Sequence, residues 1–144
     1  MKDKELILWK GFCITHKRVR VDEVKKIKEL YPNAKLLVHP ECEPAVQALA
    51  DFLGSTSEII KQAKELPQKD IIIGTEEGVM HILKKENPDK NFYLLSPGLI
   101  CANMKKTRLQ DVYLSLLNMQ HEINIDENIR LKALKSMEEM LKIV

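Results

Sequence analysis

The sequence predicts an α/β fold: a three-layer αβα domain with a short, mostly four-stranded parallel sheet, followed by C-terminal helices. Short apolar runs of strand length alternate along the chain with longer stretches whose apolar residues recur at helical spacing. This alternation is typical of βαβ units, whose strands are parallel and whose crossovers are right-handed. The 144 residues make one ordinary domain by length, without a repeat or a flexible linker. We expect an α/β domain over residues 1–101 and a helical extension over residues 102–144.

The predicted strands are the four apolar runs of the first hundred residues, at 6–9, 35–38, 70–73 and 91–95. The first run is interpreted either as part of this sheet or as a strand that completes a preceding domain absent from this chain.

Helical spacing predicts four helices in the same region: over 21–31, from Pro44 to about residue 52, from Ser55 to Pro67, and over 76–86. Pro44 lies at a first helical position, where proline is favoured. Ser55 and Glu58 form a capping box that opens the third helix, and Pro67 ends it.

The C-terminal extension is predicted to hold two further helices. Thr107 and Gln110 form a second capping box, and Asp126 caps the last helix. Each helix carries apolar residues on one face, which we expect to be buried: Leu109, Val112, Tyr113, Leu116 and Leu117 in the first, and Ile129, Ala133, Leu134, Met137 and Leu141 in the second.

The composition narrows the class of function. The net charge is only +2 and no long basic run is present, so no nucleic-acid partner is expected. No apolar stretch approaches about 20 residues, so no membrane span is expected. The N-terminus lacks a signal-peptide pattern, from which we expect a cytoplasmic location. The G-x-G-x-x-G, Walker A and G-x-S-x-G patterns are absent, so nucleotide binding and serine hydrolysis are not indicated.

Cysteines and polar side chains gather in loops just past the apolar runs, where open parallel sheets bind their ligands. Cys13 and Cys101 each occupy such a loop, and the odd number of three cysteines argues against a disulfide framework. Cysteine can ligate zinc or an iron–sulfur cluster. The alternative for each is a small buried apolar residue, which is also our interpretation of Cys42.

His39 and Glu41 follow the second predicted strand, two residues apart. The imidazole can hydrogen-bond a substrate carboxylate and the glutamate can carry protons. The alternative is a strand-end histidine beside a helix-cap glutamate.

Residues 54–57 open a helix and suit an anion, although a plain N-cap explains them as well. Residues 74–78 are interpreted as structural or substrate-shaping, because their acids disfavour an anion.

Five segments, taken in order, closely resemble the quinolinate synthase family. They are GFCITH at 11–16, HPEC at 39–42, ADFLGSTS at 50–57, GTEEG at 74–78 and CANMK at 101–105. Any one of these motifs is weak alone, but the ordered set is specific and covers nearly the whole chain.

The resemblance implies an enzyme, a transferase of de novo NAD biosynthesis. It would condense iminosuccinate with dihydroxyacetone phosphate to quinolinate, and use a 4Fe-4S cluster as a Lewis acid. Cys13 and Cys101 match two of the three cluster ligands. His16 matches a histidine close to the cluster, which is also a candidate substrate-binding residue.

The resemblance also assigns substrate contacts. His39 and Glu41 match the catalytic, substrate-contacting pair, in which Glu41 is the acid/base. Ser55 and Thr56 match hydroxyls that bind anionic groups of the substrates.

Family chains are longer, with three similar α/β domains around a central site. This chain resembles only the final strand of the middle domain, the third domain and the C-terminal helices. The first cluster cysteine has no counterpart, and Cys42 is not expected to replace it because it adjoins Glu41. We therefore expect the chain to work with an N-terminal half of the enzyme or to self-associate. The alternatives are a truncated non-catalytic remnant and a small α/β domain that binds a metal or undergoes redox chemistry.

Overall fold

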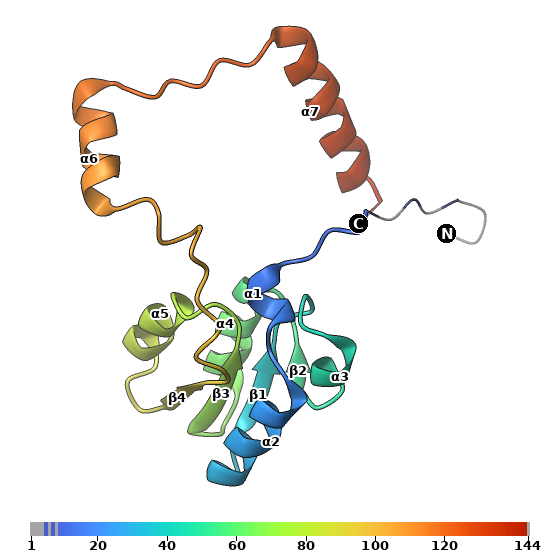
Figure 1. Cartoon of the computed structure of the whole chain (residues 1–144), viewed down its shortest axis with the longest axis vertical. Helices are drawn as coiled ribbons and strands as arrows, with labels where there is room; N and C mark the ends of the chain where they lie inside the picture. Colours follow the sequence, from blue (N-terminus) through green and yellow to red (C-terminus); the bar gives the residue numbers. More distant parts are fainter. Residues whose placement is uncertain (1–4, 6, 8, 144) are drawn as a thin grey trace. The chain divides into compact units, whose positions relative to one another are not determined.

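The computed structural model describes residues 5, 7 and 9–143 (Figure 1). It divides into two compact units, Met1–Ala102 and Asn103–Val144. The predicted division into an α/β domain over residues 1–101 and a helical extension over residues 102–144 stays a prediction.

The first unit is built on a parallel sheet of four strands in the order β2-β1-β3-β4 (Figure 1). The strands are β1 (Lys35–Val38), β2 (Phe52–Leu53), β3 (Asp70–Gly74) and β4 (Asn91–Leu94). One row of neighbours crosses the whole sheet: Phe52, Leu37, Ile73 and Leu94. Because every strand runs in the same direction, all four carboxyl ends lie at one edge.

Helices cover both faces of this sheet. α2 (Val21–Leu30) and α3 (Pro44–Gln47) pack on one face, and α4 (Thr56–Glu65) and α5 (Val79–Glu86) pack on the other. Successive side chains of a strand alternate between the faces. Leu36 and Val38 accordingly join the cluster under α2 and α3, and Leu37 joins the cluster under α4 and α5. The predicted three-layer αβα fold is confirmed.

Two details of the predicted sheet differ in the structure. In the run at 6–9, the described residues Ile7 and Trp9 are not part of this sheet and are 90% and 92% exposed; the other two residues of that run lie outside the described part. The alternative, that this run completes a preceding domain absent from this chain, stays a prediction. The sheet still has four strands, because a strand that was not predicted, β2, completes it. β2 lies in a stretch where the sequence predicts the end of a helix. A strand of two residues leaves no alternation to detect, and the preceding helix α3 ends early, at Gln47.

Asp51 explains why the chain enters β2 at this point. Its N–H donates to the carbonyl of Leu36, and its carboxylate accepts from the N–H of Leu36, both at 2.8 Å. The carboxylate also accepts from Lys35 Nζ at 2.9 Å and pairs with Lys28 Nζ at 3.5 Å. Burial raises the pKa of Asp51, but these hydrogen bonds and lysines outweigh it and leave the pKa below its usual value. Asp51 thus ties α2, β1 and β2 together.

The predicted capping box at the start of α4 is confirmed. The N–H and the hydroxyl of Ser55 both donate to Glu58 Oε2 at 2.7 Å, and the N–H of Glu58 donates to Ser55 Oγ at 3.4 Å. At the other end of α4, Lys90 Nζ donates to the carbonyls of Ala63 and Leu66 at 2.7 Å. Both ends of this helix are therefore closed by side chains.

The second unit contains α6 (Leu109–Asn118) and α7 (Glu127–Leu141). Asp126 caps α7 as predicted, since its Oδ1 accepts from the N–H groups of Asn128 at 3.0 Å and Ile129 at 3.3 Å. The capping box predicted for Thr107 and Gln110 is wrong. The N-cap is Arg108, one residue later, and Asp111 accepts from the N–H of Arg108 at 2.7 Å instead.

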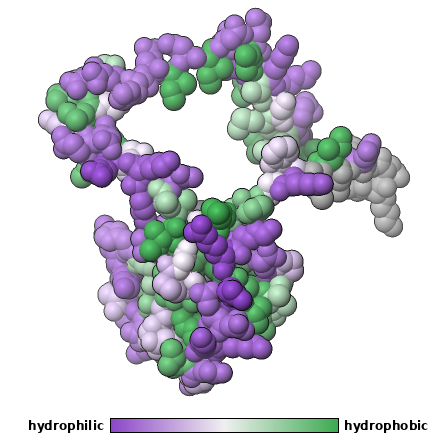
Figure 2. Space-filling model, viewed as in Figure 1, coloured by the Kyte–Doolittle hydropathy of each residue, from purple (hydrophilic) through white to green (hydrophobic). Residues whose placement is uncertain are grey.

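The apolar faces of α6 and α7 are exposed, contrary to the prediction that they are buried. The predicted inward residues of α6 are 46–85% exposed, and Ile129, Leu134, Met137 and Leu141 of α7 are 42–67% exposed; Ala133 is exposed too. Figure 2 shows apolar residues at the surface of both helices. Helical spacing identifies an apolar face but not the element that covers it, and no residue between 103 and 143 is buried. None of the described helices is both long and apolar enough to span a bilayer.

We predict that Asp51→Asn destabilises the first unit by about 1 kcal/mol at pH 7, because a hydrogen-bonded, partly screened charge is lost. The pKa of Asp51 is lowered in the folded state, so its stabilising effect is complete above the ordinary value of 3.8 and is lost as the pH falls below it. Urea unfolding at pH 7 and at pH 3 would measure both effects. Asp89→Asn, in an exposed turn, is the matched control; an equal loss of stability at both pH values would contradict the prediction.

We predict that the isolated chain self-associates through the apolar faces of α6 and α7, since contiguous exposed apolar surface drives association. Sedimentation velocity should show species larger than the 16.6 kDa monomer. The double variant Leu109→Lys and Leu116→Lys should shift the distribution towards monomer, whereas Gln110→Lys with Asn118→Lys on the same helix should not. A monomer at all concentrations would count against this use of the apolar faces.

Candidate metal centre and active site

Four loops with polar side chains open at the carboxyl edge of the sheet. In the spatial order of their strands, they are residues 54–55 after β2, 39–43 after β1, 75–78 after β3 and 95–101 after β4. The predicted gathering of polar loops at one edge is therefore confirmed for the strands that exist. The segment with Cys13 comes to this edge on a short helix rather than from a strand.

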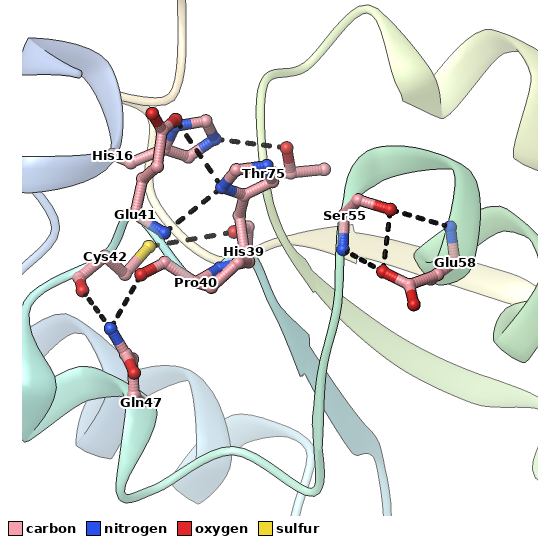
Figure 3. A network of polar contacts seen from close by, with 10 residues as sticks. His16, His39, Pro40, Glu41, Cys42, Gln47, Ser55, Glu58 and Thr75 are labelled. Carbon is pink, nitrogen blue, oxygen red and sulfur yellow. Dashed lines mark hydrogen bonds and ion pairs between the residues drawn. The ribbon is translucent and has the colours of Figure 1, made fainter. Parts of the chain in front are cut away.

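That helix is α1 (Ile14–Lys17), a single turn whose N-cap residue is Cys13. It carries His16, which is only 7% exposed. His16 Nδ1 lies 3.1 Å from Glu41 Oε2, and its Nε2 lies 3.1 Å from Thr75 Oγ1 (Figure 3). One imidazole thus joins the loop after β1 to the loop after β3.

His39 lies beside the same carboxylate. Its ring stacks on that of His16, with centroids 4.3 Å apart and planes 10° from parallel. His39 Nδ1 accepts the N–H of Glu41 at 3.2 Å and lies 3.6 Å from Glu41 Oε2. Because Nδ1 accepts, the proton of a neutral His39 sits on Nε2. The structure therefore brings the predicted pair together and adds His16 to it.

The surroundings of His16 decide its charge. Burial lowers its pKa from the ordinary 6.5, the neighbouring His39 lowers it further, and Glu41 and Glu76 oppose these effects without cancelling them. His16 is consequently mostly neutral at pH 7. A neutral imidazole can ligate a metal or exchange a proton. The Glu41 carboxylate is held by His16, and because the Glu41 side chain is 51% exposed the carboxylate remains accessible.

The three cysteines, none of which is in a disulfide in the described part of the chain, fall into two classes. Cys42 is 2% exposed, lies in the core cluster under α2 and α3, and donates its S–H towards the carbonyl of Gly74 at 3.8 Å. Burial raises the pKa of its thiol to about 11, and the nearby Cys13 and Glu41 add to the effect. Cys42 is thus a packing residue, as we expected. Cys13 and Cys101 are partly exposed and keep the access that a ligand needs.

Cys13, His16 and Glu41 form a group that could hold a metal ion. Each offers one ligand atom, and within the described part of the chain these atoms all lie within 4.8 Å of one another. The donor set is one sulfur, one nitrogen and one oxygen. Cys101, the predicted companion of Cys13, is not a member of this group.

Thr75 and Glu76 are site residues within the 74–78 loop, for which the sequence predicts a structural or substrate-shaping role without a role for either residue. Thr75 is 1% exposed and Glu76 is 8% exposed. Besides the contact of Thr75 with His16, Glu76 accepts from the N–H of Gly78 at 2.7 Å and from the N–H of Cys101 at 3.2 Å. Glu76 therefore connects the loop of Cys101 to the loop after β3. The signal that identifies both residues is their place directly after the third strand.

Ser55 and Thr56 lie at the start of α4, and both are exposed. Figure 3 shows Ser55 with Glu58, apart from the group around His16. The hydrogen bonds from Ser55 lower the pKa of Glu58 and engage the Ser55 hydroxyl in the cap. Any ligand of Ser55 would therefore share this hydroxyl with the helix.

Comparison with known proteins identifies the family. The family model described as quinolinate synthetase A protein matches residues 1–142. Proteins named quinolinate synthase are similar over about the same length: that of Alkaliphilus metalliredigens is 60% identical over 141 residues, that of Clostridium kluyveri 57% over 141, and that of Caldicellulosiruptor saccharolyticus 52% over 141. These matches cover 98% of the chain but 46% of each relative, so the chain spans about half the length of the relatives it matches. The chain belongs to the quinolinate synthase family.

Proposed function

We propose that this chain is the C-terminal portion of a quinolinate synthase, which condenses iminosuccinate with dihydroxyacetone phosphate to quinolinate. The family carries a role in NAD biosynthesis. The observation that supports the proposal most is the meeting of His16 and His39 on one oxygen of Glu41, beside Cys13, at the ligand-binding edge of the sheet. The proposed partners are the two substrates and an N-terminal half of the enzyme, and the proposed location is the cytoplasm.

A 4Fe-4S cluster is the proposed cofactor, and the thiols of this chain fit it in part. Cys13 and Cys101 are partly exposed, which suits ligands, whereas Cys42 is buried and does not suit one. Such clusters are held by several cysteine thiolates, so a third ligand must come from the N-terminal half. When bound, the cluster supplies a Lewis acid.

Glu41 is the proposed proton carrier. Removal of a proton from carbon and loss of water both require a positioned acid/base group. His16 orients the Glu41 carboxylate, Thr75 orients His16 in turn, and His39 accepts the Glu41 N–H. His39 Nε2 is then the atom that donates a hydrogen bond to a substrate carboxylate.

Ser55 and Thr56 are the proposed contacts for anionic groups of the substrates. They begin α4, where unpaired N–H groups and the helix dipole favour a negative charge. β2 places them at the same edge as the loop of Glu41.

A metal-binding domain without catalysis is the second candidate function. It is favoured by the Cys13–His16–Glu41 group, which lies within this chain alone. Restoration of turnover by a supplied N-terminal half would exclude it as the main function.

We predict that the isolated chain binds iron–sulfur weakly and binds it stably only with the N-terminal half, because two thiolates leave a 4Fe-4S cluster under-ligated. Anaerobic reconstitution with iron and sulfide, followed by visible absorption, would measure this. Cys13→Ala and Cys101→Ala should each abolish the stable cluster in the assembled enzyme. A full cluster in the isolated chain that survives Cys13→Ala would overturn the ligand assignment.

We predict that Glu41→Gln lowers turnover of the assembled enzyme by about 10²–10⁴-fold, the usual contribution of a positioned acid/base group, and leaves cluster absorbance intact. Glu43→Gln is the matched control, because Glu43 lies two residues away but pairs with the surface Lys17 at 3.5 Å. Steady-state kinetics and absorbance on the same samples would separate the effects. Normal turnover, or loss of the cluster together with turnover, would assign Glu41 a structural role.

A further inference from the structure

We propose that Glu76 is a positioning residue for the iron–sulfur cluster, because its buried carboxylate holds the segment that presents Cys101. This role rests on the proposed function, in which Cys101 is a cluster ligand. Glu76 has no part in the proposed chemistry, yet it is only 8% exposed. A carboxylate is costly to bury unless its oxygens are hydrogen-bonded. What those two oxygens hold therefore indicates what the side chain does.

The two oxygens of Glu76 bind different parts of the chain. Oε2 accepts from the N–H of Gly78, the N-cap of α5, at 2.7 Å, and Oε1 accepts from the N–H of Cys101 at 3.2 Å. The first contact spans two residues, and an aspartate makes such a contact equally well, since its side chain bonds the backbone two residues on. The second contact spans 25 residues and needs the longer side chain. The presence of a glutamate here is thus explained by its contact with Cys101.

The next residue along the chain holds the same segment at a second point. The N–H of Glu77 donates to the carbonyl of Leu99 at 2.9 Å, and the Leu99 side chain is fully buried. Leu99 and Cys101 are thus both tied to the loop after β3. Between residues 103 and 143 no residue is buried, so core packing that fixes Cys101 comes from this side of the chain and not from the segment that follows.

The preceding residue fixes the segment of the other proposed cysteine ligand. Thr75 Oγ1 lies 3.1 Å from Nε2 of His16, which belongs to α1, the helix whose N-cap residue is Cys13. Two consecutive residues, Thr75 and Glu76, therefore hold both cysteine segments from one loop. Cysteine ligands must converge on a single cluster. Without the Glu76 contact, we expect Cys101 to lose its fixed position relative to Cys13.

Amide hydrogen exchange of the 144-residue chain, followed by NMR, tests the contact without any cofactor. Glu76→Gln should lower the protection of the Cys101 N–H by about 10-fold or more, the effect of losing a hydrogen bond to a charged group. A glutamine has a single acceptor oxygen, which the closer N–H of Gly78 would take. Glu76→Asp should have the same effect on Cys101, because the shorter side chain keeps the bond to Gly78 alone. Protection of Ile72, in the middle of β3, should stay unchanged in both variants and shows that they fold.

Cluster stability in the assembled enzyme tests the role. After anaerobic reconstitution with the N-terminal half, Glu76→Gln and Glu76→Asp should each lose visible cluster absorbance to a chelator about 10–100-fold faster than the wild type, the usual effect of removing a residue that orients a metal ligand. Glu86→Gln is the matched control, because it makes the same chemical change at the exposed, opposite end of α5. It should lose the cluster at the wild-type rate.

The possible results separate this role from the proposed function. A wild-type assembly that forms no cluster would overturn the proposed function, and this role with it. A stable wild-type cluster that is equally stable in Glu76→Gln, or fully restored in Glu76→Asp, would overturn the role of Glu76 alone, since aspartate rescue would limit Glu76 to the turn before α5. Unchanged protection of the Cys101 N–H in both variants would also overturn it. Loss of Ile72 protection in both would make Glu76 a residue of the fold and overturn it as well.

Discussion

The pairing of β1 with β3 positions the two loops that carry His39 and Thr75 at the candidate site. Val38 lies beside Gly74 at the last register position, and the N–H of His39 then donates to the carbonyl of Gly74 at 3.0 Å. A side chain at Gly74 would place a Cβ 2.9 Å from Val38 Cγ2 and 3.1 Å from the carbonyl of Leu37, so only glycine permits this close approach. The two strands consequently release His39 and Thr75 side by side, and His16 fits between their loops.

Regular elements of the first unit follow from local patterns in the sequence. The apolar runs of β1, β3 and β4 and the Ser55–Glu58 cap depend on residues a few positions apart, so they could be predicted. β2 could not, because what creates it is the bond between Asp51 and Leu36, a contact between side chain and backbone across 15 residues. Similarly, helical spacing locates the apolar faces of α6 and α7 but contains no information on what covers them.

The candidate site also has one part that the local sequence predicts and another that depends on contacts between residues far apart in the chain. The spacing of His39 and Glu41 and their place after a strand allow both side chains to face one site, and the structure brings them together. The contacts of His16 with Glu41 and Thr75 span 25 and 59 residues, and these depend on the strand order and on the turn of α1. The motif resemblance pointed to His16 as a neighbour of a cofactor. The structure adds that this histidine holds the proposed acid/base residue, so the two roles meet in one side chain.

The exposed apolar faces of α6 and α7 in unit 103–144 affect the thermodynamics of assembly. Helices of 10 and 15 residues without a buried face are marginal in water, because helix nucleation is costly and packing usually supplies the missing stability. Any surface that covers α6 and α7 must therefore also order them, and part of the gross contact energy is spent on conformational entropy. Association of this segment would then show a large negative heat-capacity change and an affinity below that expected from its contact area. Such coupling makes assembly easily reversible, and sensitive to temperature in a way that a preformed interface is not.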